Sequence, residues 1–271
     1  MKQTTQKHAE VTRRTFIICS LAIVVALISA PQYVLAQTAP ASAGPAEAKL
    51  IEDLIAANRI LVDKGVIDIR GHVSVRHERD ANRYLMSRAL APELARAEDI
   101  LEFDLDNRAV DAKGRALFNE RFIHGEIYKA RPDVKAVVHA HTPSIVVFSS
   151  SNVPLRPVHF SANFAGDPVP TFQNGLAGAG IGSPELGQAL AKALGNGGAV
   201  MMRGHGVVVV GFSLPSVVGR SVNLDMNAQI LARTLAIGGN VIYLRPPENA
   251  AAVNNPYDRE WEAWKKKVMS R

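Results

Sequence analysis

Three histidines stand in two short motifs whose spacing could hold a metal ion. His139 and His141 lie one residue apart in AVVHAHTPS (residues 136–144), at the end of an apolar run. Alternate residues of a strand face the same side, so both imidazoles can point at one ion while Ala140 faces the other way. An HxH pair alone does not distinguish metal ligands from unrelated strand histidines.

The third histidine, His205, lies in MMRGHGVVVVG (residues 201–211), between two glycines and two apolar runs. Glycine on both sides lets the backbone turn tightly and come close to a ligand, which exposes the imidazole at a strand end. Three neutral imidazoles with an open fourth position suit a catalytic divalent ion. Zinc is the simplest choice, and Mn²⁺, Fe²⁺ or Co²⁺ would also fit this ligand type.

These histidines must be positioned by a mixture of helices and short strands. Apolar periodicity, turn residues and capping residues predict helices at 48–63, 120–130 (capped by Asn119), from 143, and at 215–237 and 256–269. Alternating or continuous apolar runs predict strands at 72–76, 83–86, 100–103, 134–141, 199–202, 207–210 and 241–244. Helices and strands that share one core indicate a layered α/β domain.

The N-terminal segment has the layout of an export signal. Residues 1–36 combine a basic start, an apolar run at 16–30 and a small-residue exit, which predicts a signal peptide cleaved after Ala36. The apolar run is shorter than the roughly 20 residues of a membrane-spanning helix. Arg13 and Arg14 precede it as in a twin-arginine signal, so we expect use of the export machinery and a periplasmic protein.

Composition bounds the rest of the chain. The 271 residues, 47% hydrophobic, suffice for one large domain at 48–271, preceded by a flexible Ala/Pro/Ser/Gly-rich linker at 37–47. Cys19 is the only cysteine and lies in the signal, so a mature chain would have no disulfide. The formal net charge of +6 falls by half when the signal is removed, which gives no case for nucleic acid as a partner.

NERFIHGEIYKARPDVKAVVHAHTPSIVVFSS (119–150) together with RGHGVVVVG (203–211) resembles the class II aldolase/adducin family, from about Ala48 onward. The resemblance implies a three-layer α/β/α fold around a mixed, largely antiparallel sheet. It also implies that His139, His141 and His205 hold the metal and that Glu120 is the general acid/base. Members of this family are usually homotetramers with the site at a subunit interface.

Two neighbours of Glu120 leave alternatives open. Glu126 lies further along the same expected helix and competes for the acid/base role, although a solvated helix face is the simpler interpretation. His124 is one turn after Glu120 and could hydrogen-bond to it, or it could be structural.

The sequence departs from the family's sugar-phosphate aldolases where they bind phosphate. The small donors of those enzymes are replaced by Gly71-His72, approximately Ala89-Leu90, and Phe118-Asn119. We therefore expect a small, non-phosphorylated hydroxy or oxo acid as substrate. His72 could donate a hydrogen bond to a substrate oxygen. Of the arginines near these segments, Arg88 or Arg121 could bind the carboxylate.

The resemblance implies a metal-dependent lyase that breaks a C–C bond, by aldol cleavage or decarboxylation, through a metal-stabilised enolate or enediolate. GHVSVR and HGEIYKARPDV look closer to the family's decarboxylases than to its sugar aldolases. An epimerase or isomerase that uses the same site, or a non-catalytic adducin-like binding protein, are the alternatives. Trp261 and Trp264, if exposed, would contribute to a homotetramer; packing within the subunit is the other possibility.

Overall fold

The computed structural model describes residues 38–173, 180–244 and 257–270. The expected signal peptide and its cleavage site lie outside these residues. Residues 38–47 form no helix or strand, but hydrogen bonds connect them to the domain. The Glu102 carboxylate accepts from the Ala43 amide at 2.7 Å, and the Arg83 guanidinium donates to the Ala41 carbonyl.

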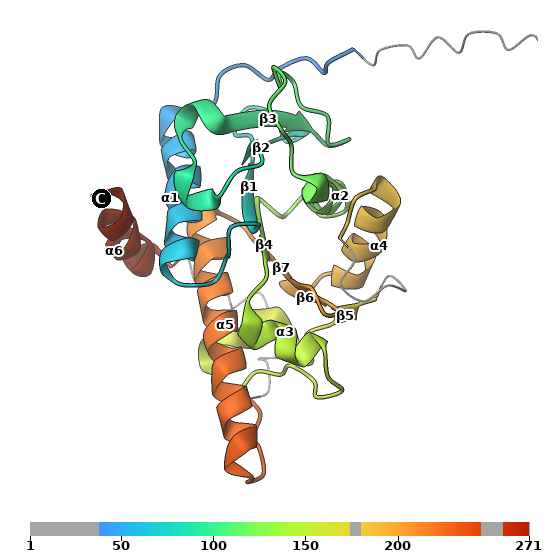
Figure 1. Ribbon diagram of the computed structural model, residues 1–271, viewed down its shortest axis with the longest axis vertical. Coiled ribbons are helices and arrows are strands. Elements are labelled where there is room, and N and C mark those ends of the chain that lie inside the picture. The colour runs from blue at the N-terminus through green and yellow to red at the C-terminus, as the bar shows by residue number, and fades with distance from the viewer. Residues whose placement is uncertain (1–37, 174–179, 245–256, 271) are drawn as a thin grey trace, which may run out of the picture. The chain divides into compact units, whose positions relative to one another are not determined.

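A seven-stranded sheet forms the centre of the domain, with strand order β3-β2-β1-β4-β7-β6-β5 (Figure 1). All neighbouring strands are antiparallel except β5 and β6, which are parallel. The expected mixed, largely antiparallel sheet is therefore confirmed. The strands are β1 (His72–Arg76), β2 (Arg83–Ser87), β3 (Ile100–Asp104), β4 (Ala136–Ala140), β5 (Thr171–Phe172), β6 (Ala199–Met202) and β7 (Gly206–Gly211).

Helices cover both faces of the sheet, which gives the expected three layers (Figure 1). One face packs against α1 (Ala48–Asp63), α3 (Pro143–Ser149) and α5 (Leu214–Ile237), and the other against α2 (Phe122–Ala130) and α4 (Pro184–Leu194). The helix α6 (Asp258–Met269) packs against α1 and α5. Short 3₁₀ helices lie at Pro92–Leu94, Ala97–Asp99, Asn119–Arg121 and Phe160–Ala165. None of the described helices is long and apolar enough to cross a membrane.

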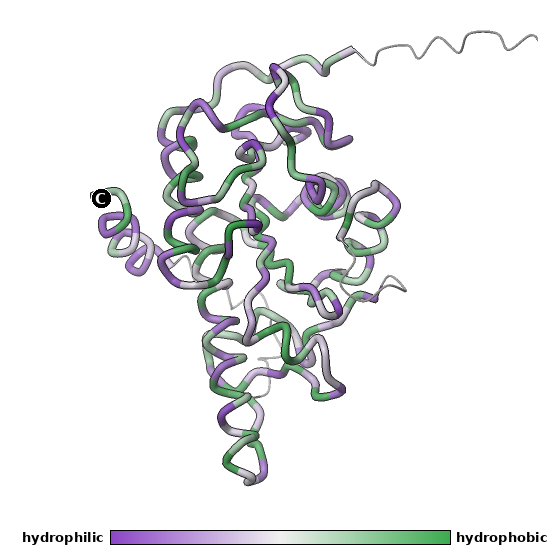
Figure 2. The backbone as a smooth tube through the Cα atoms, viewed as in Figure 1, coloured by the Kyte–Doolittle hydropathy of each residue, from purple (hydrophilic) through white to green (hydrophobic). Residues whose placement is uncertain are grey.

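Successive residues of the central strands pack into different cores. Val138 faces the α1/α5 side, whereas Val137 faces the α2/α4 side. Both faces of β4 are thus buried, which accounts for its continuous apolar run and for the hydrophobic centre in Figure 2. His139 shares the α2 side with Val137 because the two residues are two apart on the strand.

Several expected boundaries are wrong. Residues 241–244 are not a strand: their one backbone hydrogen bond, from Leu244 to the Pro157 carbonyl, reaches a loop and no sheet edge. Asn119 does not cap a helix, because Glu120 (φ −87°, ψ 15°) interrupts it and α2 begins only at Phe122. The strand β4 ends at Ala140, so His141 lies just beyond it. The helix α4 and the strand β5 were not anticipated.

The closing helix packs within the subunit. Trp261 is only 4% exposed and belongs to the core, so packing within the subunit is the possibility that holds for this residue. Trp264 packs against the same core beside the Lys64 ammonium group. Ion pairs from Lys265 to Asp53 and from Lys267 to Asp63 connect α6 to α1. The two tryptophans therefore stabilise the contact of α6 with its own domain.

Candidate functional site

The three predicted histidines and the predicted carboxylate come together in one cluster. Ligand atoms of Glu120, His139, His141 and His205 all lie within 4.8 Å of one another. The Nε2 atom of His141 is 3.1 Å from that of His139 and 3.0 Å from that of His205. Glu120 Oε2 is 3.4 Å and 3.6 Å from Nε2 of His139 and His205. Four potential ligands from three segments thus converge on one point.

Backbone geometry places His205 at this point. The chain leaves β6 at Met202, turns through Gly204 at φ +64°, and enters β7 at Gly206. A Cβ atom on Gly206 would lie 2.2 Å from the Ala140 carbonyl oxygen, so only glycine allows this close approach of the turn to the end of β4. The two glycines therefore bring His205 beside His141.

The tautomers of two histidines suit a cation. Nδ1 of His139 lies 3.2 Å from the Val207 carbonyl oxygen, and Nδ1 of His141 lies 2.9 Å from the Asp68 carboxylate. Each of these acceptors holds a proton on Nδ1, which leaves a lone pair on Nε2. The lone pairs would repel one another without a proton or cation between them. Two nitrogens bound to one zinc ion would be about 3.0–3.4 Å apart, so the donor set fits a divalent metal.

Asp68 is a functional candidate that sequence reasoning missed. Its carboxylate pairs with His141 and also accepts from the backbone amides of Arg70 and Gly71. Burial raises the pKa of Asp68, but the hydrogen bonds from His141 and the backbone amides lower it by more. The pKa is therefore below its usual value, and the carboxylate is ionised. The only hint in the sequence is an acidic residue in the turn before β1.

Glu120 lies on the irregular turn before α2, with its side chain 17% exposed. The amide of Ile181 donates to its Oε1 at 2.9 Å, which leaves Oε2 toward the histidines. Burial raises the pKa of Glu120, but the contacts of its carboxylate with the His139 and His205 rings outweigh burial and lower the pKa below its usual value. The group is therefore a carboxylate in the resting protein.

A pocket of about 370 Å³ opens beside Glu120. Its polar wall carries His72, Asn119 and Glu120 from β1 and the turn before α2. Its other walls are mostly apolar and come from loops, with Ile69, Arg70, Ala89, Leu90, Ala91 and Phe118. No cradle of small hydroxyl or amide donors for a phosphate surrounds this described pocket.

The family model for the class II aldolase and adducin N-terminal domain matches residues 52–232, about two thirds of the chain. The chain belongs to this family.

Relatives of two kinds are found. Decarboxylase tropJ of Talaromyces stipitatus is 29% identical over 80% of this chain and 93% of its own. A 3,4-dihydroxyphthalate decarboxylase of Arthrobacter keyseri is 29% identical over 69% of this chain and 79% of its own. The solved structure of L-fuculose 1-phosphate aldolase from Glaciozyma antarctica PI12 superposes with a TM-score of 0.68 at 25% identity, covering 86% of this chain and 94% of that one. This class II aldolase family member is therefore a lyase.

The arginines predicted to bind a substrate carboxylate are held elsewhere. Arg88 pairs with Asp99 at 2.6 Å, and Arg121 donates to the backbone carbonyls of Asn107 and Phe118. Neither lines the pocket beside Glu120, whereas the exposed Arg70 does. Arg76 is buried, and its guanidinium donates to backbone carbonyls. Arg70 is therefore the arginine that the structure brings to the site.

The structure places both neighbours of Glu120 outside the histidine cluster. Glu126 is 2% exposed, so its assignment to a solvated helix face is wrong. Its carboxylate pairs with Lys129 at 2.8 Å and is absent from the histidine cluster. His124 does not contact Glu120 but hydrogen-bonds to His72 and Ser74 in the interior.

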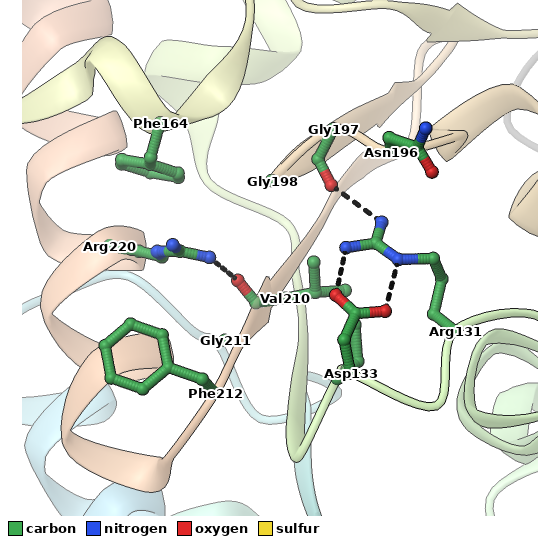
Figure 3. Close-up of a pocket in the computed structure, with 11 residues that line it drawn as sticks. Arg131, Asp133, Phe164, Asn196, Gly197, Gly198, Val210, Gly211, Phe212 and Arg220 are labelled. Carbon is green, nitrogen blue, oxygen red and sulfur yellow. Dashed lines mark hydrogen bonds and ion pairs between the residues drawn. The ribbon is translucent and has the colours of Figure 1, made fainter. Parts of the chain in front are cut away.

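A second pocket, of about 390 Å³, lies at the opposite end of β7 and does not suit this chemistry (Figure 3). Arg131 and Asp133 pair across it through two contacts, so their charges offset each other. Arg220 lies between Phe164 and Phe212 and donates to the Val210 carbonyl. The lining contains no histidine and no second carboxylate.

Proposed function

We propose that this family member is a metal-dependent decarboxylase of a hydroxylated aromatic acid. The observation that carries the proposal is the convergence of three imidazole Nε2 atoms and the Glu120 carboxylate at the edge of a largely apolar pocket. A reacting carboxylate and hydroxyl group can sit at the cluster while an aromatic ring occupies the apolar part of the pocket.

His139, His141 and His205 are the metal ligands in this proposal, and zinc is the simplest ion for them. A bound divalent ion supplies Lewis acidity that stabilises the negative charge left when a C–C bond breaks. Asp68 and the Val207 carbonyl orient two of the imidazoles through their Nδ1 atoms.

Glu120 moves the proton. As a carboxylate it accepts the proton of the substrate hydroxyl group, which increases electron density on the ring. The bond to the carboxyl group then breaks, carbon dioxide leaves, and the electron pair stays on the ring carbon. Glu120 returns the proton to that carbon, which regenerates the carboxylate, and the product leaves as a phenolate that takes up a proton from water. The hydrogen bond from the Ile181 amide holds Oε1 in place during both transfers.

The relatives support decarboxylation over aldol cleavage, because two of them are decarboxylases by name and one acts on a dihydroxyphthalate. The pocket supports the same choice. Phe118, Ala89 and Leu90 stand in it where a phosphorylated sugar would need hydrogen-bond donors. Aldol cleavage of a non-phosphorylated hydroxy acid is the second candidate, since fuculose phosphate aldolases are also relatives.

Metal content and product analysis test the proposal. We expect about one equivalent of metal per subunit in the native protein, little in His141→Ala, and the native amount in the control His159→Ala. His159 is a suitable control because its ring bonds to Ser161, away from the cluster. Dihydroxybenzoic and dihydroxyphthalic acids should then release carbon dioxide. Formation of an aldehyde, or of an epimer with the carbon skeleton intact, would refute decarboxylation.

We propose further that the protein acts in the periplasm as a homotetramer. The twin-arginine-like motif at Arg13 and Arg14 and the apolar run after it support export. Exposed apolar side chains support subunit contacts: Phe160 and Ile237 are 75% and 82% exposed.

A further inference from the structure

A buried chain of hydrogen bonds begins at the pocket and ends in the interior. His72 Nδ1 lies 2.7 Å from His124 Nε2, and His124 Nδ1 lies 2.6 Å from the Ser74 hydroxyl. The Ser74 hydroxyl lies 2.8 Å from the hydroxyl of Tyr128. All four residues are at most 1% exposed, so water does not compete for these bonds. The proposed reaction does not use His124, Ser74 or Tyr128.

The Tyr128 end of these hydrogen bonds determines which group donates in each of them. Among the described residues, Ser74 is the only hydrogen-bond partner of the Tyr128 hydroxyl. The phenolic proton must therefore lie between these two oxygens, because a buried O–H without an acceptor is costly. Ser74 accepts that bond, so its own proton is donated to Nδ1 of His124.

The same reasoning assigns the protons of the two imidazole rings. His124 accepts at Nδ1, so a neutral ring carries its proton on Nε2 and donates it to Nδ1 of His72. His72 then accepts at Nδ1 and carries its proton on Nε2. Burial lowers the pKa of His124 to about 3, so this ring is neutral, and a His72 ring that accepts at Nδ1 holds a proton on Nε2 alone. Burial raises the pKa of Tyr128, which keeps the phenol protonated.

His72 is the member of the chain that reaches the substrate pocket. It lines the pocket together with Phe118, Asn119 and Glu120. Because His124 occupies Nδ1, Nε2 is the ring nitrogen available to a bound molecule. The register of β1 and β4 pairs His72 with His139, and the centroids of the two rings are 5.1 Å apart, so the His72 ring lies beside the histidine cluster.

We propose that His72 is a neutral hydrogen-bond donor whose Nε2–H contacts an oxygen of the bound acid, and that Ser74 and His124 are positioning residues that hold the proton on this nitrogen. The inference rests on the proposed function, because it concerns the same pocket. A donor fixed in this orientation stabilises an oxygen on which negative charge develops, and no rearrangement is needed during the reaction. The buried hydrogen bonds thus determine that the substrate meets an N–H group of His72 and not a nitrogen lone pair.

Nitrogen NMR of ¹⁵N-histidine-labelled protein tests the tautomer without any substrate. We expect the His72 resonances, assigned by their loss in His72→Gln, to report a protonated Nε2 and an unprotonated Nδ1. Ser74→Ala removes the donor to His124 and should shift them toward a mixture of tautomers. Tyr128→Phe is the matched control and should leave them unchanged, because the Ser74 hydroxyl still donates to His124. A proton on Nδ1 of His72 in the native protein overturns the proposal.

Kinetics test the donor role. His72→Leu should lower kcat by about 100-fold or more with metal content unchanged, whereas His72→Gln, whose amide N–H reaches a similar position, should stay within about 10-fold of the native value. Equal kcat for His72→Leu and the native protein would overturn the donor role. Failure of this inference can be distinguished from failure of the proposed function. The wrong tautomer refutes this inference whatever the activity, while the right tautomer without turnover of any acid refutes the proposed function.

Discussion

The Asp68 carboxylate lies 2.9 Å from Nδ1 of His141, so an acidic side chain from the turn before β1 orients a ring that follows β4. Carboxylates in this position increase the basicity of a ligating imidazole and fix its tautomer. We expect Asp68→Ala to weaken zinc binding by about 10–100-fold. Asp68→Asn, whose amide oxygen can still accept from His141, should lose less. Competition with a fluorescent chelator measures the affinity; equal affinities for the native protein and Asp68→Ala would contradict an orienting role.

Glu120→Gln should retain the metal and lose turnover. The three imidazoles remain, but the amide cannot accept and return a proton, so we expect kcat to fall by about 10²–10⁴-fold. Glu126→Gln is the matched control, since its side chain pairs with Lys129 outside the cluster and should leave kcat within about threefold. The assignment of Glu120 fails if the two variants have the same kcat on a confirmed substrate.

Arg70→Met should raise KM for an acid substrate by about tenfold with a smaller change in kcat, because Arg70 is the arginine that lines the pocket. Arg88→Met provides the comparison. Its guanidinium already pairs with Asp99 beside exposed surface, so we expect an unchanged KM and a loss of at most about 1 kcal/mol in the free energy of unfolding. Initial-rate measurements on both variants show which arginine binds the substrate. A raised KM only in Arg88→Met would assign this role to Arg88 and not to Arg70.

Acid should destabilise the fold through His124. Its pKa is about 3 in the folded protein, whereas an unfolded chain takes up this proton near pH 6.5. Between these values the unfolded state binds more protons, so the free energy of unfolding falls as the pH falls. We expect His124→Gln to lose less stability than the native protein between pH 6 and pH 4. The slopes of the free energy of unfolding against pH should differ by about 1.4 kcal/mol per pH unit. Urea denaturation with a chelator present measures the slopes; parallel curves would contradict this account.

Replacement of both Arg13 and Arg14 by lysine should keep the protein in the cytoplasm of a bacterial host, because twin-arginine export depends on that pair. Replacement of Lys2 and Lys7 by glutamine is the control and should leave export intact. Cell fractionation followed by immunoblotting distinguishes the outcomes. Equal periplasmic amounts of the double-lysine variant and the native protein would indicate ordinary secretion.

Features encoded within one short segment could be predicted from the sequence. The period of apolar residues in α1 and α5, and the alternation that sets His139 against Ala140, are local signals. Contacts between distant segments could not be predicted. Asp68 and His141 are 73 residues apart, and His72 and His124 are 52 apart, so their pairing depends on the packing of loops and strands. The burial of Trp261 and Glu126 likewise depends on neighbouring helices.

The histidines and most of the pocket walls belong to different parts of the fold. His72 lies on β1, and His139 and His205 lie on or next to β4 and β7, whose register is fixed by the sheet. Ala89, Leu90 and Ala91 lie in a loop that carries none of the catalytic groups. Substitutions in the loops can therefore change which acid is accepted without disturbing the catalytic groups. A library restricted to these loop positions would be a direct route to new substrate ranges on an unchanged reaction.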